Sequence, residues 1–212
     1  MKSGNTSDKP PVIVICGPTA SGKSAAAVRV AETCAGVVIN ADSMQVYREL
    51  PVLTAQPTAA DQARVPHRLY GSLSATERCT AGRWRSLALA EIDAAYVSGR
   101  IPIIVGGTGL YLKALMEGLA PVPPVPAEIR ARARALHDEL GAARFHAELA
   151  RIDPLMAARL AAADTQRVLR AYEVVAATGT SLATFQRDTQ QTDVAFLPLL
   201  LMPPRALLHA AI

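Results

Sequence analysis

Residues 17–24 read Gly-Pro-Thr-Ala-Ser-Gly-Lys-Ser and match the pattern GxxxxGK[ST] of a phosphate-binding loop. The loop follows an apolar, β-branched run at Pro11–Cys16 that is typical of a buried strand, and it precedes an alanine-rich helical segment at Ser24–Cys34. In that setting the backbone N–H groups can surround an anion at a helix N-terminus. A chance match on a tight turn is the alternative. We predict that a diphosphate or triphosphate is bound by Gly17, Pro18, Thr19, Ala20, Ser21, Gly22, Lys23 and Ser24.

Lys23 and Ser24 have separate expected roles within this loop. The Lys23 ammonium would contact the terminal phosphates as a point charge, and the Ser24 hydroxyl would be a ligand of Mg²⁺. Mg²⁺ is therefore the expected cofactor.

The composition indicates a globular protein. Half of the 212 residues are hydrophobic, the net charge is +4, and the three cysteines lack metal-ligand spacing. No apolar run reaches the length of a membrane span, and the polar N-terminus lacks the apolar part of a signal peptide. We expect reduced thiols, a cytoplasmic location, no membrane association and a monomer, with residues 1–10 as a loose tail.

Strands and helices are expected to alternate in the first part of the chain. Expected strands lie at Val37–Ala41, Leu69–Leu73 and Ile101–Val105, and expected helices lie at Ala81–Ser98 and from Gly109 to Met116. This order favours an α/β fold, a P-loop-type parallel sheet with helices on both faces.

A proline-rich segment, PVPPVP at 121–126, interrupts that order. From Ala127 to about Arg187 the sequence is rich in Ala, Arg and Leu with helical periodicity, and strand character returns at Phe196–Met202. Asp153 and Asp164 are expected helix N-caps, and Gly179 is an expected helix stop. We predict a P-loop core at 11–120, an all-helical insertion at 121–190 and a return to the core at 191–212.

Asp42 and Thr108 follow expected strands and should meet at one edge of the sheet. A nucleoside triphosphatase usually has an acidic residue at the end of a later buried strand, but here that strand runs into Gly-Gly-Thr-Gly. Asp42 could be a general base, a helix N-cap or an indirect Mg²⁺ ligand. Thr108 could offer its hydroxyl to a substrate or cap the next helix.

Six blocks resemble one family when they are taken in order. They are GPTASGKS at 17–24, NADSMQVY at 40–47, TAQPT at 54–58, PHRL at 66–69, VGGTGLYL at 105–112 and DTQRVLRAYEV at 164–174. Their order and spacing resemble the tRNA dimethylallyltransferases, also called tRNA isopentenyltransferases.

The resemblance implies transfer of a dimethylallyl group from dimethylallyl diphosphate to N6 of adenine 37, in tRNAs that read codons beginning with U. The P-loop would then hold the diphosphate of the prenyl donor. Lys23 would stabilise that leaving group, Asp42 would be the general base and Thr108 would lie at the reaction centre.

The resemblance also implies which residues meet the tRNA. These are Asp42, Ser43, Met44 and Gln45 around the adenine, together with Thr108, Arg130, Gln166, Arg167, Val168, Leu169 and Arg170. Without the resemblance, Arg167 and Arg170 would be interpreted as part of a solvated helix face.

Departures from the family pattern are Arg68 in place of a second His, Gln56 in place of Lys, and Ser24 in place of Thr. Chains of that family are longer, so a C-terminally truncated form is expected.

Three alternatives stay open at this point. A small-molecule P-loop kinase could use Asp42 to activate a hydroxyl acceptor. An adenylate prenyltransferase would use the same donor with a free nucleotide, and a nucleotide-dependent binding module would perform no chemistry.

Overall fold

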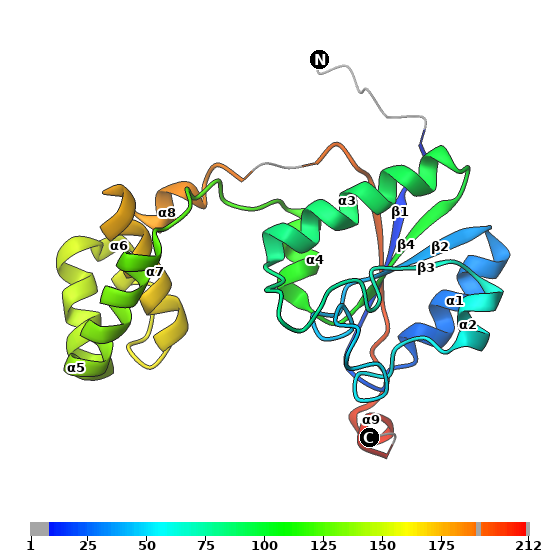
Figure 1. Ribbon diagram of the computed structural model, residues 1–212, viewed down its shortest axis with the longest axis horizontal. Helices are drawn as coiled ribbons and strands as arrows, with labels where there is room; N and C mark the ends of the chain where they lie inside the picture. Colours follow the sequence, from blue (N-terminus) through cyan, green and yellow to red (C-terminus); the bar gives the residue numbers. More distant parts are fainter. Residues whose placement is uncertain (1–8, 190–191, 211–212) are drawn as a thin grey trace. The chain divides into compact units, whose positions relative to one another are not determined.

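The computed structural model describes residues 9–189 and 192–210, so residues 1–8 of the expected tail lie outside it. The described chain forms two compact units, one of residues 9–118 with 192–210 and one of residues 119–189 (Figure 1). None of the helices in these ranges combines the length and apolarity that crossing a membrane requires.

The first unit contains a five-stranded, fully parallel sheet in the order β3-β2-β4-β1-β5. The strands are β1 (Val12–Cys16), β2 (Gly36–Asn40), β3 (His67–Arg68), β4 (Ile101–Gly106) and β5 (Phe196–Leu200). The three central strands are almost entirely buried, as expected for a parallel sheet covered on both faces. The predicted α/β fold class is confirmed.

Helices cover both faces of this sheet (Figure 1). On one face α1 (Lys23–Thr33) packs against Ile15, Val38 and Ile103, and α2 (Ala59–Arg64) lies beside it. On the other face α3 (Ala81–Val97) and α4 (Gly109–Met116) bury Trp84, Ile92 and Leu115 against the strands. The short helix α9 (Arg205–Ala210) follows β5.

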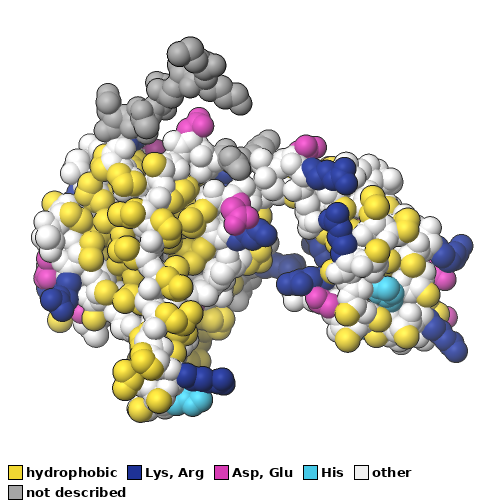
Figure 2. Space-filling model, turned by 180° about the vertical axis from the view of Figure 1, so that it is seen from behind, with side chains coloured by type: hydrophobic (Ala, Val, Ile, Leu, Met, Phe, Trp, Pro, Cys, Tyr) yellow, Lys and Arg dark blue, Asp and Glu magenta, His cyan; other side chains and the backbone are white. Residues whose placement is uncertain are grey.

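The edge strand β5 is much less covered than its neighbours. Leu197, Leu199 and Leu200 are 47%, 43% and 63% exposed. Seen from behind, the sheet unit presents a broad group of hydrophobic side chains (Figure 2). β5 therefore contributes backbone pairing to β1 but little buried apolar area.

The third strand was expected at Leu69–Leu73, and this prediction is wrong. The paired residues are His67 and Arg68, and the chain then turns because Leu69 and Gly71 adopt φ angles of 62° and 53°. Positive φ is incompatible with an extended strand. Leu73 forms only an isolated bridge with Tyr47.

The second unit is all-helical. It contains α5 (Ala127–Ile152), α6 (Pro154–Ala157), α7 (Thr165–Thr178) and α8 (Leu182–Phe185), and α5 is interrupted at Gly141. The Asp153 and Asp164 side chains accept hydrogen bonds from backbone N–H groups at the starts of α6 and α7, and Gly179 ends α7 in the left-handed conformation. These three predicted boundaries are confirmed.

Close backbone contact joins the ends of β2 and β4. The Ala41 N–H donates to the Val105 carbonyl over 2.7 Å, and the Thr108 N–H donates to the Ala41 carbonyl over 3.3 Å. A Cβ atom at Gly106 would lie 2.3 Å from the carbonyl carbon and oxygen of Ala41. No side chain fits there, so glycine is required for the two loops to meet.

We expect Gly106→Ala to lower the free energy of unfolding by about 3 kcal/mol or more, because the clash involves backbone that cannot rotate away. Urea denaturation measures the loss. Gly109→Ala is the control, because a Cβ there meets no atom within 4 Å. Equal stability of the two variants would contradict the assigned contact.

Candidate active site

The predicted site residues of the first unit gather at the carboxyl edge of the sheet. The P-loop follows β1, Asp42 follows β2 and Thr108 follows β4, and these three strands are neighbours or next-neighbours. Ligands of open α/β sheets bind at this edge, where strand order reverses. The structure thus brings the phosphate loop and both polar candidates into one region.

The P-loop is held against the segment that follows β5. A Cβ atom at Gly17, where φ is 152°, would lie 2.2 Å from the Leu201 carbonyl oxygen. The Leu201 N–H also donates to the Cys16 carbonyl over 2.8 Å. The return of the chain to the sheet therefore fixes where the loop begins.

Lys23 folds back over this loop. Its ammonium donates to the Pro18 carbonyl and lies 3.4 Å from the Ser21 hydroxyl. Burial lowers the Lys23 pKa, and the nearby Asp42 carboxylate opposes that shift. A partly dehydrated cation on such a loop favours an incoming anion.

Asp42 is half-buried at this edge, and its carboxylate is oriented by its own turn. Its Oδ1 atom accepts from the Met44 N–H over 2.8 Å. This is an intraturn bond and no helix begins at Asp42, so the helix N-cap alternative is wrong. The carboxylate also raises the pKa of Tyr70, although burial is the larger cause.

Asn40 anchors this turn from below, and sequence reasoning missed it. Its side chain is fully buried; its Oδ1 accepts from the Asp42 N–H over 2.8 Å, and its Nδ2 donates to the Asp42 and Leu69 carbonyls over 3.0 and 3.1 Å. The Trp84 indole N–H donates to the Asn40 carbonyl over 2.8 Å. An amide at the end of the apolar run GVVIN was the available signal.

Thr108 stands at the N-cap position of α4, but its side chain does not cap that helix. Its Oγ1 atom accepts from the Ser43 N–H over 3.0 Å and lies 3.4 Å from the Ser43 hydroxyl. The capping alternative for this hydroxyl is therefore wrong. Thr108 links the end of β4 to the turn that carries Asp42.

Met44 and Gln45 complete the turn in different ways. The Met44 side chain is 49% exposed. The Gln45 amide donates to the carbonyls of Thr54 and Ala55 over 2.7 and 3.2 Å, so its nitrogen is engaged by a neighbouring loop.

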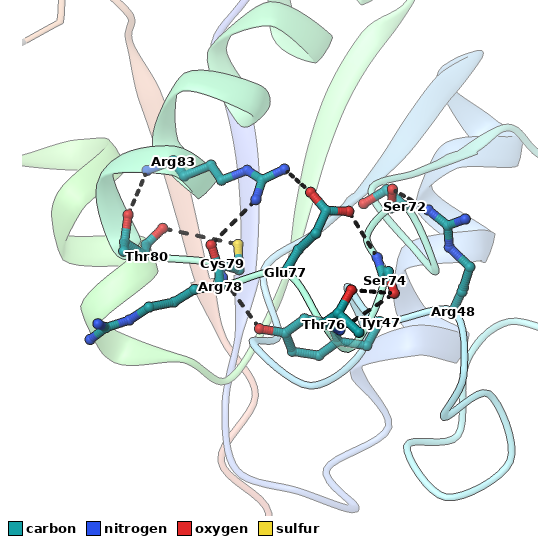
Figure 3. Close-up of polar contacts among 10 residues, drawn as sticks. All are labelled: Tyr47, Arg48, Ser72, Ser74, Thr76, Glu77, Arg78, Cys79, Thr80 and Arg83. Atoms are coloured by element: carbon teal, nitrogen blue, oxygen red, sulfur yellow. Dashed lines mark hydrogen bonds and ion pairs between the residues drawn. The ribbon is translucent and has the colours of Figure 1, made fainter.

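A polar network joins Tyr47 and Arg48 to the segment from Ser72 to Arg83 (Figure 3). The Tyr47 hydroxyl accepts from the Cys79 N–H over 3.3 Å. Glu77 accepts from the Ser74 N–H and the Arg83 guanidinium, and the Arg83 hydrogen bond lowers the Glu77 pKa. Nearby, the rings of Trp84 and Tyr111 stack at 4.6 Å.

The remaining predicted residues belong to the helical unit. Arg130 on α5 and Gln166, Arg167 and Arg170 on α7 are exposed. Leu169 is half-buried, and the Val168 side chain is 1% exposed within the helical core. The Val168 side chain therefore packs in the helical core, and its expected contact with tRNA stays a prediction.

Comparison with known proteins decides the family. A family model described as IPP transferase matches residues 45–212, and one described as isopentenyl transferase matches residues 10–76. This chain belongs to the IPP transferase family. The resemblance drawn from its motifs is confirmed.

Relatives in this family include tRNA dimethylallyltransferases of Rhodospirillum centenum and Paramagnetospirillum magneticum, which are 56% and 54% identical over 95% and 97% of this chain. The chain spans 65% and 66% of their lengths.

Two solved structures of transferases have the same fold. A eukaryotic dimethylallyltransferase acting on tRNA superposes with a TM-score of 0.79 at 27% identity, covering 92% of this chain and 49% of that one. The tRNA isopentenylpyrophosphate transferase of Bacillus halodurans gives a TM-score of 0.61 at 31% identity, covering 96% and 63%.

We expect Asn40→Ala to lower the free energy of unfolding by about 1–3 kcal/mol, because it leaves buried backbone groups of Asp42 and Leu69 without partners. Chemical denaturation measures this loss. Gln62→Ala is the control, since the Gln62 amide makes one exposed bond to the Pro57 carbonyl. A cost for Asn40→Ala no larger than for Gln62→Ala would refute the anchoring role.

Proposed function

We propose that this protein transfers the dimethylallyl group of dimethylallyl diphosphate to N6 of adenine 37, in tRNAs that read codons beginning with U. The product is N6-isopentenyladenosine. The observation that most supports this proposal is a P-loop lysine beside the Asp42 carboxylate that follows β2. In contrast, β4 ends at Gly106 and is followed by Gly107 and Thr108, with no acidic residue. The names of the relatives, tRNA dimethylallyltransferases, support this reaction.

In this proposal the diphosphate is the leaving group, and the P-loop holds it. The bond from C1 of the dimethylallyl group to the diphosphate oxygen breaks, and negative charge develops on the leaving group. Lys23 and the loop N–H groups would stabilise that charge, because hydrogen-bond donors and a cation are strongest where negative charge develops. No phosphoryl group is transferred, so the acidic residue of a nucleotide-hydrolysing site is unnecessary.

Mg²⁺ fits this loop as a partner of the diphosphate. Within the described residues no cluster of three or more His, Cys, Asp or Glu side chains could hold a metal by itself. Mg²⁺ normally binds through few protein ligands, waters and phosphate oxygens, and the Ser24 hydroxyl at the first turn of α1 is exposed for that purpose. When bound, it would neutralise charge on the leaving diphosphate.

Asp42 would take the proton from N6. As the new N–C bond forms, one N6 proton must leave, and an aromatic amine is too weak a nucleophile without this help. Within the described chain, only Oδ1 of the carboxylate accepts a hydrogen bond, from Met44, which leaves Oδ2 for the substrate. Thr108 and Ser43 would position the adenine beside it.

The helical unit would hold the RNA. Arg130, Arg167 and Arg170 are exposed cations suited to phosphate contacts, and Gln166 and Leu169 lie beside them. The acceptor adenine must leave the anticodon-loop stack to reach Asp42. We place this reaction in the cytoplasm and assign it to a monomer.

Incubation with labelled dimethylallyl diphosphate and unmodified tRNA tests the proposal. We expect label on adenine 37 without added ATP. ATP turnover with no transfer to tRNA would support the kinase alternative instead, and label on free adenylate alone would support the adenylate prenyltransferase.

Asp42→Ala should lower the rate of transfer by about 10²–10⁴-fold while leaving diphosphate binding nearly unchanged, because only the base is lost. Lys23→Ala should instead weaken diphosphate binding, which calorimetry measures. Asp93→Ala is the matched control, since that carboxylate is 71% exposed on α3. Near-normal transfer by Asp42→Ala would exclude it as the base.

A further inference from the structure

A loop at the carboxyl edge of the sheet exposes two large aliphatic side chains. Val52 is 92% exposed and Leu53 is 81% exposed, in the turn that joins Leu50 to Ala55. Elsewhere in the described chain, only Val97 among the large hydrophobic residues reaches such exposure, at 90%. Two adjacent residues of this kind need an explanation, because the fold does not require apolar side chains there.

This loop is tightly bonded within itself. The Thr54 N–H and hydroxyl both donate to the Leu50 carbonyl, over 3.1 and 2.6 Å. The Gln56 N–H donates to the Pro51 carbonyl over 2.9 Å, and the Ala55 N–H donates to the Val52 carbonyl over 3.1 Å. The exposed tip is therefore presented on a defined backbone.

Two glutamine side chains tie the loop to the Asp42 turn. Gln45, three residues after Asp42, donates to the Thr54 and Ala55 carbonyls. From the loop side, the Gln56 amide donates to the Tyr47 carbonyl over 2.8 Å. The position of the Val52–Leu53 tip is thus coupled to the position of the candidate base.

The foot of the loop also borders the phosphate site. A cavity of about 340 Å³ is lined by Ala55 and Gln56 from the loop, by Ser24 from the first turn of α1, and by His67 and Tyr70. The loop therefore lies against both halves of the proposed reaction, the Ser24 side and the Asp42 side.

We propose that Val52 and Leu53 form an apolar wedge that packs against the nucleobase next to the acceptor adenine. This rests on the proposed function. Extrusion of a base leaves a gap in the stack, and aliphatic side chains on a rigid loop can fill it and contact the flat face of the neighbouring base. The partner is an unpaired nucleobase, because the tip is tied to the Asp42 turn where the acceptor base would react. The exposed Arg48 beside the loop adds a cation suited to the phosphate of the same nucleotide.

The test uses an anticodon stem-loop RNA with 2-aminopurine on the 3′ side of the acceptor adenine. Its fluorescence rises when the neighbouring stack opens, and its titration gives the Kd. We expect the V52S/L53S double variant to bind about tenfold more weakly than the unchanged protein, through loss of apolar contact, and to lose most of the fluorescence rise. Inorganic diphosphate binding and Tm should stay unchanged.

Val97→Ser is the matched control, because it removes an equally exposed valine from the end of α3. The conservative variant V52I/L53M should retain binding and the fluorescence rise. If V52S/L53S keeps both within twofold, or if Val97→Ser weakens binding equally, the wedge is wrong. Failure of the unchanged protein to bind the stem-loop contradicts the proposed function itself, and the wedge with it.

Discussion

The contact between the ends of β2 and β4 determines where every candidate group lies. Gly106 passes so close to Ala41 that a Cβ atom would lie 2.3 Å from its carbonyl carbon. Because the two strand ends touch, the turn after β2 and the loop after β4 share hydrogen bonds, from Ser43 to Thr108 and from Thr108 to Ala41. With a larger separation, Asp42 and Thr108 would still follow their strands, but the Ser43–Thr108 hydrogen bond that joins their two loops could not form.

Burial of polar groups gives this arrangement its rigidity. Asn40 is fully buried, and its amide hydrogen bonds hold the backbone of Asp42 on one side and the Leu69 carbonyl on the other. In such surroundings an unpaired amide is costly, so the native set of partners is strongly preferred over any displaced one. Trp84 extends the same constraint to α3, and its ring stacks on Tyr111 of α4.

Charge is distributed across the edge in a way that suits departure of an anion. Lys23 is partly dehydrated, while Asp42 is close enough to favour its charged form. A cation at the P-loop and a carboxylate at the next strand end can serve opposite ends of one displacement. The loop from Leu50 to Gln56 is hydrogen-bonded to the Asp42 turn through Gln45 and Gln56, and Ala55 and Gln56 line a cavity together with Ser24.

The sequence alone determined the P-loop, the alternation of strands and helices, and the helix boundaries at Asp153, Asp164 and Gly179, because each depends on local spacing and backbone preference. Only the tertiary structure decided the partners of Asn40, the hydrogen bond of Thr108, the turn at Leu69 and the burial of Val168. Those features depend on contacts between segments far apart in the chain. Local pattern carries no information on which carbonyl a buried amide will meet, and packing supplies it.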